Sequence, residues 1–231
     1  MSECSSKEFV QLKTPEEGNW ISLGRALTTH LCQGLRPFIK RETEAFYNNL
    51  RAAIAAGACT CVYDPGRKPN QYHDMGACKW ANALQGYHLG RRLNWKQSDS
   101  SKWLDPNIGP WEIVKLFLPD VGINTVIESV DDLEITNILN LMFWCNHFTV
   151  QRPLIKDVRD IRNTKWAHVL KLELSEIEKK DAFDAIEELL KDPALASDLD
   201  VRNALQEIST LKSTKETCTF SEQRFCTVLN R

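Results

Sequence analysis

The sequence predicts an all-α protein of the helical-bundle type with one inserted lobe. Apolar residues recur at three- and four-residue spacings over most of the chain, which is the period of an amphipathic helix, and strand-like alternation is scarce. The segment 57–109 breaks this pattern, because it is rich in glycine, proline, cysteine and tryptophan. We therefore expect a single domain over residues 1–231, with a helical core over about 19–56 and 110–191 and a Cys/Trp-containing lobe over about 57–109.

The first helical segment runs from Asn19 to about Ala56. Its large apolar side chains share one face: Trp20, Leu23, Leu27, Leu31 and Leu35. Pro37 lacks a backbone N–H and its ring clashes with the preceding turn, so we expect a kink or a break there. In the lobe that follows, only "ACKWANALQGYHLGRRL" is helical in pattern.

The helical pattern returns after Pro110. "WEIVKLFL" predicts a short helix that Pro119 ends, and a second helix over 131–146 starts with acidic residues, which suit a helix N-terminus. A third helix is expected over 152–166.

Two more helices are expected toward the C-terminus. One covers 175–191, where Ser175 and Glu178 have the spacing of a capping box. The other covers about 193–212, and the polar tail from Ser213 is expected to be flexible.

Charge and composition exclude several classes of protein. With 29 basic and 31 acidic residues the net charge is −2, so any contact with nucleic acid needs a local cationic patch. No apolar run is long enough to span a membrane, and the N-terminus lacks the pattern of a secretory signal. We expect a soluble cytoplasmic protein that makes no membrane contact, with a nuclear location left open.

Eight cysteines without an export signal favour thiols or a metal site over disulfides. Cys32 and Cys145 lie in apolar helical patterns and are expected in the core. The lobe holds five potential zinc ligands: Cys59, Cys61, His73, Cys78 and His88. Cys-x-Cys is a poorer chelating turn than Cys-x-x-Cys, so we favour ordinary buried thiols and expect no cofactor.

The tryptophans of the lobe allow two interpretations. They are Trp80, Trp95, Trp103 and Trp111. They could stack on unpaired bases while nearby cations bind phosphates; these cations are Lys79, Arg91, Arg92 and Lys96. We favour the other interpretation, in which they pack the lobe onto the bundle, because large aromatic side chains mostly anchor cores.

The stretch "DIRNTKWAHV", residues 160–169, raises the question of chemistry. On a helical wheel one apolar stripe forms, made of Leu154, Ile155, Val158 and Ile161, and beside it a cationic ridge, made of Arg152, Lys156, Arg159 and Arg162. Arg162 falls between Ile155 and Val158 in angle, so we expect partial desolvation and a need for an anionic partner. Four carboxylates are candidates: Glu42, Glu44, Asp131 and Asp132.

His168 lies about 120° around an ideal helix from Arg162. The two side chains converge only if the helix ends before His168 or if a second chain completes the site. The simpler alternative is a ridge of solvated charges with a histidine at a helix end.

"RNTKWAH" resembles the signature of the HEPN superfamily of helical bundles, which has an arginine, a polar residue and a later histidine. The resemblance implies a HEPN-like bundle and RNA chemistry that needs no metal and acts across a dimer. Arg162 would hold the phosphate, Asn163 would orient the histidine or the phosphate, and His168 would move a proton. Phosphate contacts would come from the nearby cations Arg152, Lys156, Arg159 and Lys165.

A second resemblance covers residues 19–174. "GRAL", "RETEAFYNNL", "WEIVKLFLP" and "CNHFTV" are similar to an uncharacterised vertebrate family, whose human member is named only as an X-chromosome open reading frame. This family implies a fold and supplies no activity. We expect a HEPN-type, RNA-associated domain that acts as a homodimer; the resemblance leaves open whether it is a metal-independent endoribonuclease or a non-catalytic RNA-binding module. The alternative is a non-catalytic interaction or scaffold module, whose acidic helix "LSEIEKKDAFDAIEELLKD" docks an unidentified protein partner.

Overall fold

The computed structural model describes residues 9–10, 14–54, 78–119, 127–214 and 220–221. This part of the chain is predominantly helical, as the periodicity predicts. The α-helices are α1 Pro15–Arg25, α2 Cys32–Ala53, α3 Lys79–Tyr87, α4 Gly109–Lys115, α5 Ile135–Trp144, α6 Arg152–Ile161, α7 Glu176–Leu190 and α8 Leu199–Ser213. Shorter or wider helical turns are η1 Ala26–Leu31, η3 Trp95–Gln97, η4 Ser100–Lys102, η5 Val130–Asp132 and η6 Arg162–Ala167. Strand β1 (Phe9–Val10) pairs antiparallel with β2 (Phe220–Ser221).

The first helical segment is one long run, α1–η1–α2. It starts at Pro15 because Thr14 and Glu17 form a capping box. Of the kink or break expected at Pro37, the break does not occur: α2 continues through the proline to Ala53. The core-facing side chains on either side of this proline, Leu35 and Phe38 among them, are buried, and their packing holds the helix together despite the lost hydrogen bond.

Three other predicted boundaries need correction. The helix expected from residue 131 begins at Ile135, because Ser129 and Asp132 cap the separate turn η5. The helix expected from residue 193 begins at Leu199, where Asp198 accepts hydrogen bonds from the backbone of Asp200 and Val201. Helix α4 ends at Lys115, before Pro119 is reached. The predicted capping box of Ser175 and Glu178 is confirmed at the start of α7.

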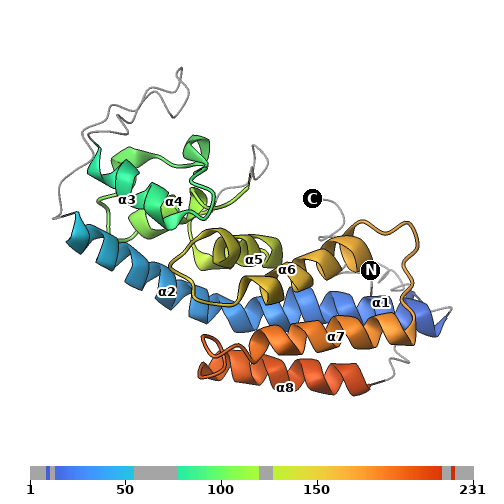
Figure 1. Ribbon diagram of the computed structural model, residues 1–231. Coiled ribbons are helices and arrows are strands. Elements are labelled where there is room, and N and C mark those ends of the chain that lie inside the picture. Colours follow the sequence, from blue (N-terminus) through green and yellow to red (C-terminus); the bar gives the residue numbers. More distant parts are fainter. Residues whose placement is uncertain (1–8, 11–13, 55–77, 120–126, 215–219, 222–231) are drawn as a thin grey trace, which may run out of the picture.

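The long run α1–η1–α2 is the axis of the molecule (Figure 1). Helices α7 and α8 pack against each other and against the half of the run formed by α1, η1 and the start of α2. Helix α5 packs on α2 and α6, and α6 in turn packs on α7, so the run is covered on two sides. A continuous buried core joins all of these helices. Cys32 and Cys145 are buried in it, as predicted.

The described part of the lobe, α3 to α4, lies at the end of α2 (Figure 1). Trp80 and Trp103 are fully buried and their ring centroids are 5.5 Å apart, while Trp95 lies 6.3 Å from Trp103. Tyr47 of α2 donates a hydrogen bond to the carbonyl of Trp103 (2.8 Å). Trp80, Trp103 and Trp111 are buried in the core that the lobe shares with the bundle, as the packing interpretation predicts, and Trp95 is partly buried against it. Apart from β2, the tail after Thr214 lies outside the described residues, as does 55–77.

Candidate functional site

Helix α6 presents the cationic ridge because its other face is held in the core. Ile155 and Val158 are fully buried, as the wheel predicts. Leu154 and Ile161 are partly buried against the same core. The start of the helix is fixed by the buried carboxylate of Asp192, which accepts a hydrogen bond from the backbone N–H of Gln151 (3.0 Å).

The motif itself is a π-helical turn, η6, that continues α6. Its anchor is Trp166, which is buried and stacks on Trp20 of α1 with ring centroids 6.3 Å apart. Trp20 Nε1 also donates to the carbonyl of Trp166 (3.3 Å). Thr164 Oγ1 donates to the carbonyl of Asp160 (2.7 Å), a side-chain bond that competes with the backbone ladder. Such wide turns are rare and occur frequently at functional sites.

Arg162 is half-buried and has no carboxylate partner among the described residues. Its Nη1 donates to Asn163 Oδ1 (3.0 Å), while its Nε is buried without a hydrogen bond to any described group. Burial lowers the pKa of this guanidinium, and the charge of Glu134 opposes that shift. The candidate carboxylates do not pair with it; Glu42 contacts His147 instead (3.0 Å).

His168 ends the helical turn and is exposed to solvent (φ −123°, ψ 34°). Within the described ranges it makes no hydrogen bond or ion pair, so nothing ties it to Arg162 or Asn163. The structure therefore places Arg162 and Asn163 in contact with each other and leaves the role of His168 a prediction.

The lysines of the predicted phosphate set are neutralised. Lys156 pairs with Asp160 (2.6 Å), and this hydrogen bond raises the pKa of Lys156. Lys165 pairs with Glu178 (2.5 Å). Several hydrogen bonds lower the pKa of Glu178 to about 2, and the one from Lys165 has the largest effect.

The arginines are held by neutral groups instead. Arg152 donates to the carbonyl of Phe143 (3.3 Å) and to Asn146 Oδ1 (2.6 Å). The Arg159 guanidinium lies 4.8 Å from the centre of the Phe143 ring. Neither one has a carboxylate in ion-pair distance in the part of the chain that the structure describes. We call Arg152, Arg159 and Arg162 the arginine ridge, since these three keep an unneutralised charge along one side of α6 and η6.

The zinc hypothesis falls mostly outside the described residues, which do not include Cys59, Cys61 or His73. Cys78 is buried and acts as the N-cap of α3, its Sγ accepting from the backbone of Ala81 (3.5 Å). His88 stacks on aromatic rings. No group of three or more His, Cys, Asp or Glu side chains in the described ranges is arranged to hold a metal ion.

Sequence reasoning missed a pocket of about 440 Å³ next to His88. Its walls come from the lobe, from the turn after α4 and from Trp144 at the end of α5. His88 forms a β-bridge with Cys145, and the neighbouring Leu89 N–H donates to the carbonyl of Trp144 (2.9 Å). No local pattern could have revealed this meeting of distant segments.

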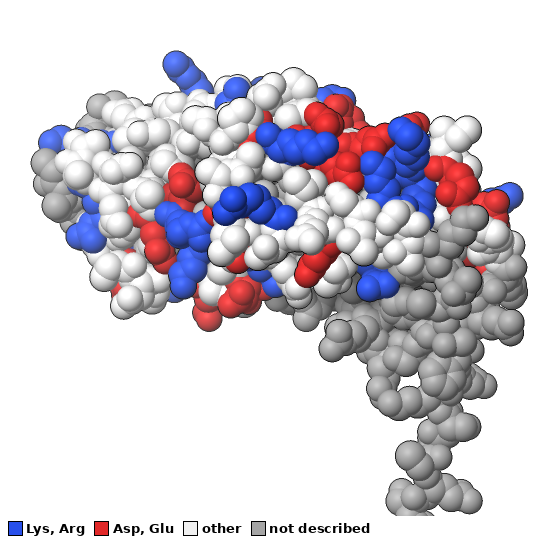
Figure 2. All heavy atoms as spheres, turned by 90° about the horizontal axis from the view of Figure 1, so that it is seen from below, with Lys and Arg blue, Asp and Glu red and all other residues white. Residues whose placement is uncertain are grey.

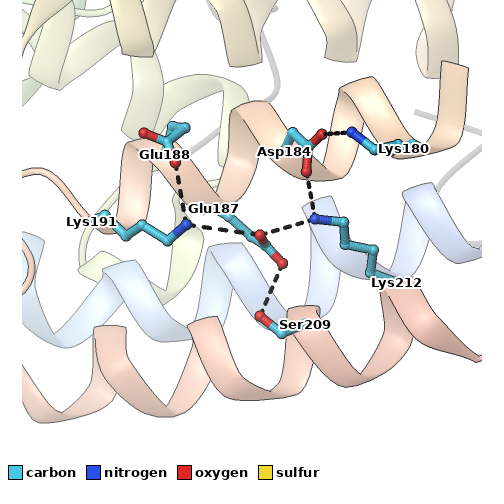
Figure 3. Close-up of polar contacts among 7 residues, drawn as sticks. All are labelled: Lys180, Asp184, Glu187, Glu188, Lys191, Ser209 and Lys212. Atoms are coloured by element: carbon cyan, nitrogen blue, oxygen red, sulfur yellow. Dashed lines mark hydrogen bonds and ion pairs between the residues drawn. The ribbon is translucent and has the colours of Figure 1, made fainter. Parts of the chain in front are cut away.

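The acidic helix α7 of the alternative hypothesis carries carboxylates that lysines neutralise (Figure 3). Asp184 pairs with Lys180 and Lys212, both at 2.5 Å. Glu187 pairs with Lys212 (3.0 Å) and accepts a hydrogen bond from Ser209 (2.9 Å). Seen from below, this side of the molecule shows basic and acidic side chains interspersed rather than a patch of one sign (Figure 2).

Comparisons with known proteins give a family and one curated relative. The family described as "Domain of unknown function (DUF4559)" matches residues 11–227. The chain is 26% identical over 168 residues to the "Uncharacterized protein CXorf38 homolog" of Mus musculus, a match that covers 68% of the chain and 50% of the relative. The chain thus spans about half the length of the curated relative it matches. No solved structure matches the chain. No helix of the described residues is long and apolar enough to cross a membrane.

Proposed function

The chain belongs to the family described as Domain of unknown function (DUF4559), and we propose that it is a HEPN-type, RNA-associated domain. In this proposal the arginine ridge binds RNA, and Arg162, Asn163 and His168 cleave it without a metal when two copies combine. The observation that carries the proposal is the half-buried guanidinium of Arg162, which has no carboxylate partner among the described residues. An arginine that served only to staple the fold would be expected to have its buried N–H groups paired with an acceptor, whereas the buried Nε of Arg162 has none among the described groups.

Arg162 suits a phosphate because a guanidinium presents several N–H donors in a fixed plane. Asn163 accepts one of them at 3.0 Å, which restrains the orientation of that plane. Partial burial strengthens the attraction to an anion, because the local dielectric constant is lower than that of water. A phosphate held in this way would gain further stabilisation as charge builds up on it in the transition state.

His168 supplies the proton transfer in this proposal. An imidazole is the side chain best suited to move a proton near neutral pH, either from a ribose 2′-hydroxyl or to the leaving oxygen. Its exposure and its lack of a partner within the described residues leave both ring nitrogens open to a substrate.

A second copy of the chain would complete the site, because no hydrogen bond or ion pair joins His168 to Arg162 among the described residues. Three exposed apolar side chains follow His168 in the sequence: Leu170, Leu172 and Ile177. Exposed apolar side chains of this size are candidates for a protein interface. Sedimentation equilibrium of the wild type and of a Leu170→Ser/Ile177→Ser variant tests this step. A dimer that the double variant converts to monomer is expected, and an unchanged monomer in both would contradict it.

The test of function is incubation of the pure protein with mixed RNA in EDTA, comparing the wild type with Arg162→Gln and His168→Ala. We expect Arg162→Gln to weaken RNA binding and both variants to abolish cleavage. The matched controls are Arg202→Gln, an exposed arginine of α8, and His30→Ala, a histidine of η1 that binds Glu207. If Arg162→Gln and Arg202→Gln bind RNA equally well and the wild type cleaves nothing, the proposal is wrong.

The alternative function, docking of a protein partner by α7, has less physical support. Its carboxylates at Glu178, Asp184 and Glu187 are already paired with lysines. A basic partner would have to displace those lysines before it could bind.

A further inference from the structure

The pocket beside His88 has the dimensions of a small-molecule site. Its volume of about 440 Å³ lies within the range of about 300–1,000 Å³ that is usual for such sites. The lining residues are His88, Gly90, Arg92, Leu93, Asn94, Lys96, Phe117, Leu118, Pro119 and Trp144. None of them belongs to α6 or η6, so the pocket is distinct from the candidate site of the arginine ridge.

The charge of the pocket is positive. Arg92 and Lys96 line it, and no aspartate or glutamate does. Both cations are exposed, and neither makes an ion pair with any carboxylate in the ranges that the structure describes. Two unpaired cations on one pocket attract an anion, and a phosphate group fits both of them.

Three of the lining side chains, His88, Phe117 and Trp144, are stacked aromatic rings. The His88 ring stacks on Trp144 with centroids 5.5 Å apart and on Phe117 with centroids 5.8 Å apart, and both interplanar angles are 15°. Trp144 is only half-buried, so part of its indole remains accessible in the pocket that it lines. A flat ring that stacks on an exposed indole is a common mode of base recognition.

One ring nitrogen of His88 is available to a ligand. The backbone N–H groups of Gly90 (3.0 Å) and Arg92 (3.3 Å) both donate to Nδ1, which must therefore be the acceptor nitrogen of a neutral ring. The proton lies on Nε2, for which no described residue provides an acceptor. The turn that aims the two backbone groups includes Arg91 at φ 53°, a conformation uncommon for this residue type and typical of functional sites.

The geometry points to a nucleotide-binding pocket. The base would stack on Trp144 and accept a hydrogen bond from His88 Nε2, and the phosphate would bind Arg92 and Lys96. The nucleotide could be a free mononucleotide or an unpaired residue of an RNA strand, since the chemistry is the same. The inference does not depend on cleavage at Arg162 and His168.

Isothermal titration calorimetry of the full chain tests the inference with defined probes. The probes are adenosine monophosphate, uridine monophosphate, adenosine, inorganic phosphate and a five-residue oligouridylate. At least one monophosphate or the oligomer should bind the wild type, and inorganic phosphate and adenosine should bind more weakly, because each lacks half of the recognised group. Raising the salt concentration should weaken the binding.

Variants then locate the binding. Arg92→Gln/Lys96→Gln should reduce the affinity at least about tenfold, since both phosphate contacts are lost. Trp144→Leu should also reduce it, provided that circular dichroism shows an unchanged fold. Lys79→Gln is the matched control, an exposed cation at the start of α3 that does not line the pocket, and it should leave the affinity unchanged.

The outcomes separate this inference from the proposed function. Arg162→Gln should leave mononucleotide binding unchanged, so loss of RNA cleavage and loss of nucleotide binding are independent results. The oligomer could bind where the mononucleotides do not. If Arg92→Gln/Lys96→Gln abolishes that binding, the pocket is supported and its ligand is an unpaired nucleotide of an RNA strand. The inference is overturned if no probe binds, if the double variant binds as the wild type does, or if inorganic phosphate binds as tightly as the nucleotides.

Discussion

Gly24 of α1 controls the position of Trp166 and with it the turn that carries Arg162. A Cβ added at Gly24 would lie 2.5 Å from Trp166 Nε1 and 3.1 Å from its Cε2, so the rigid indole must move. Overpacking of this kind costs about 1–3 kcal/mol. Alanine favours a helix over glycine by about 1 kcal/mol, which offsets part of that cost. We therefore expect Gly24→Ala to lower the free energy of unfolding by up to about 2 kcal/mol.

The control is Gly86→Ala in α3, where an added Cβ meets no atom within 4 Å. This change should be neutral or stabilising by up to about 1 kcal/mol, because only the helix preference acts. Urea unfolding followed by circular dichroism measures both variants, and the two should differ by about 1–3 kcal/mol. RNA binding should fall for Gly24→Ala alone. Equal stabilities for the two variants would refute the close packing of Trp166 on α1.

Three further outcomes follow from the electrostatics and burial. Because the pKa of Glu178 is lowered from 4.5 to about 2, its ion pair with Lys165 stabilises the fold above pH 4.5 and is lost as the pH falls toward 2. Glu178→Gln should cost about 0.5–1 kcal/mol at neutral pH, and urea titrations should show the difference from wild type shrink below pH 4.5 and vanish only below about pH 2. Burial raises the pKa of Cys145 to about 12, so iodoacetamide should label this thiol only after unfolding. Peptide mass spectrometry would show the labelling, and labelling of the native protein would argue against a packed α5. Burial lowers the pKa of His88, so NMR should find its midpoint below 6.5, and stability should decrease as the pH falls below 6.5; an ordinary midpoint would contradict its stacked position.

The sequence by itself determined most of the helices and one face of each. Spacing of apolar residues predicted that Ile155 and Val158 are buried, and the Ser175–Glu178 pair marked the start of α7. These features depend on contacts within one or two turns, which the order of residues specifies directly. The same local logic failed at Pro37, where packing of distant segments outweighs a lost hydrogen bond.

Only the tertiary structure decided the environment of the candidate residues. The wheel predicted that Arg162 is partly desolvated, and it is. The sequence offered four carboxylates as its partner without choosing among them, and none of them pairs with it. The π-helical turn at Arg162 depends on how Trp166 packs against α1, and the pocket depends on how His88 meets Trp144 across a β-bridge. Periodicity shows which face of a helix is buried. The groups that meet that face depend on how whole helices pack against one another. That packing is set by contacts between distant segments, which no short stretch of sequence specifies.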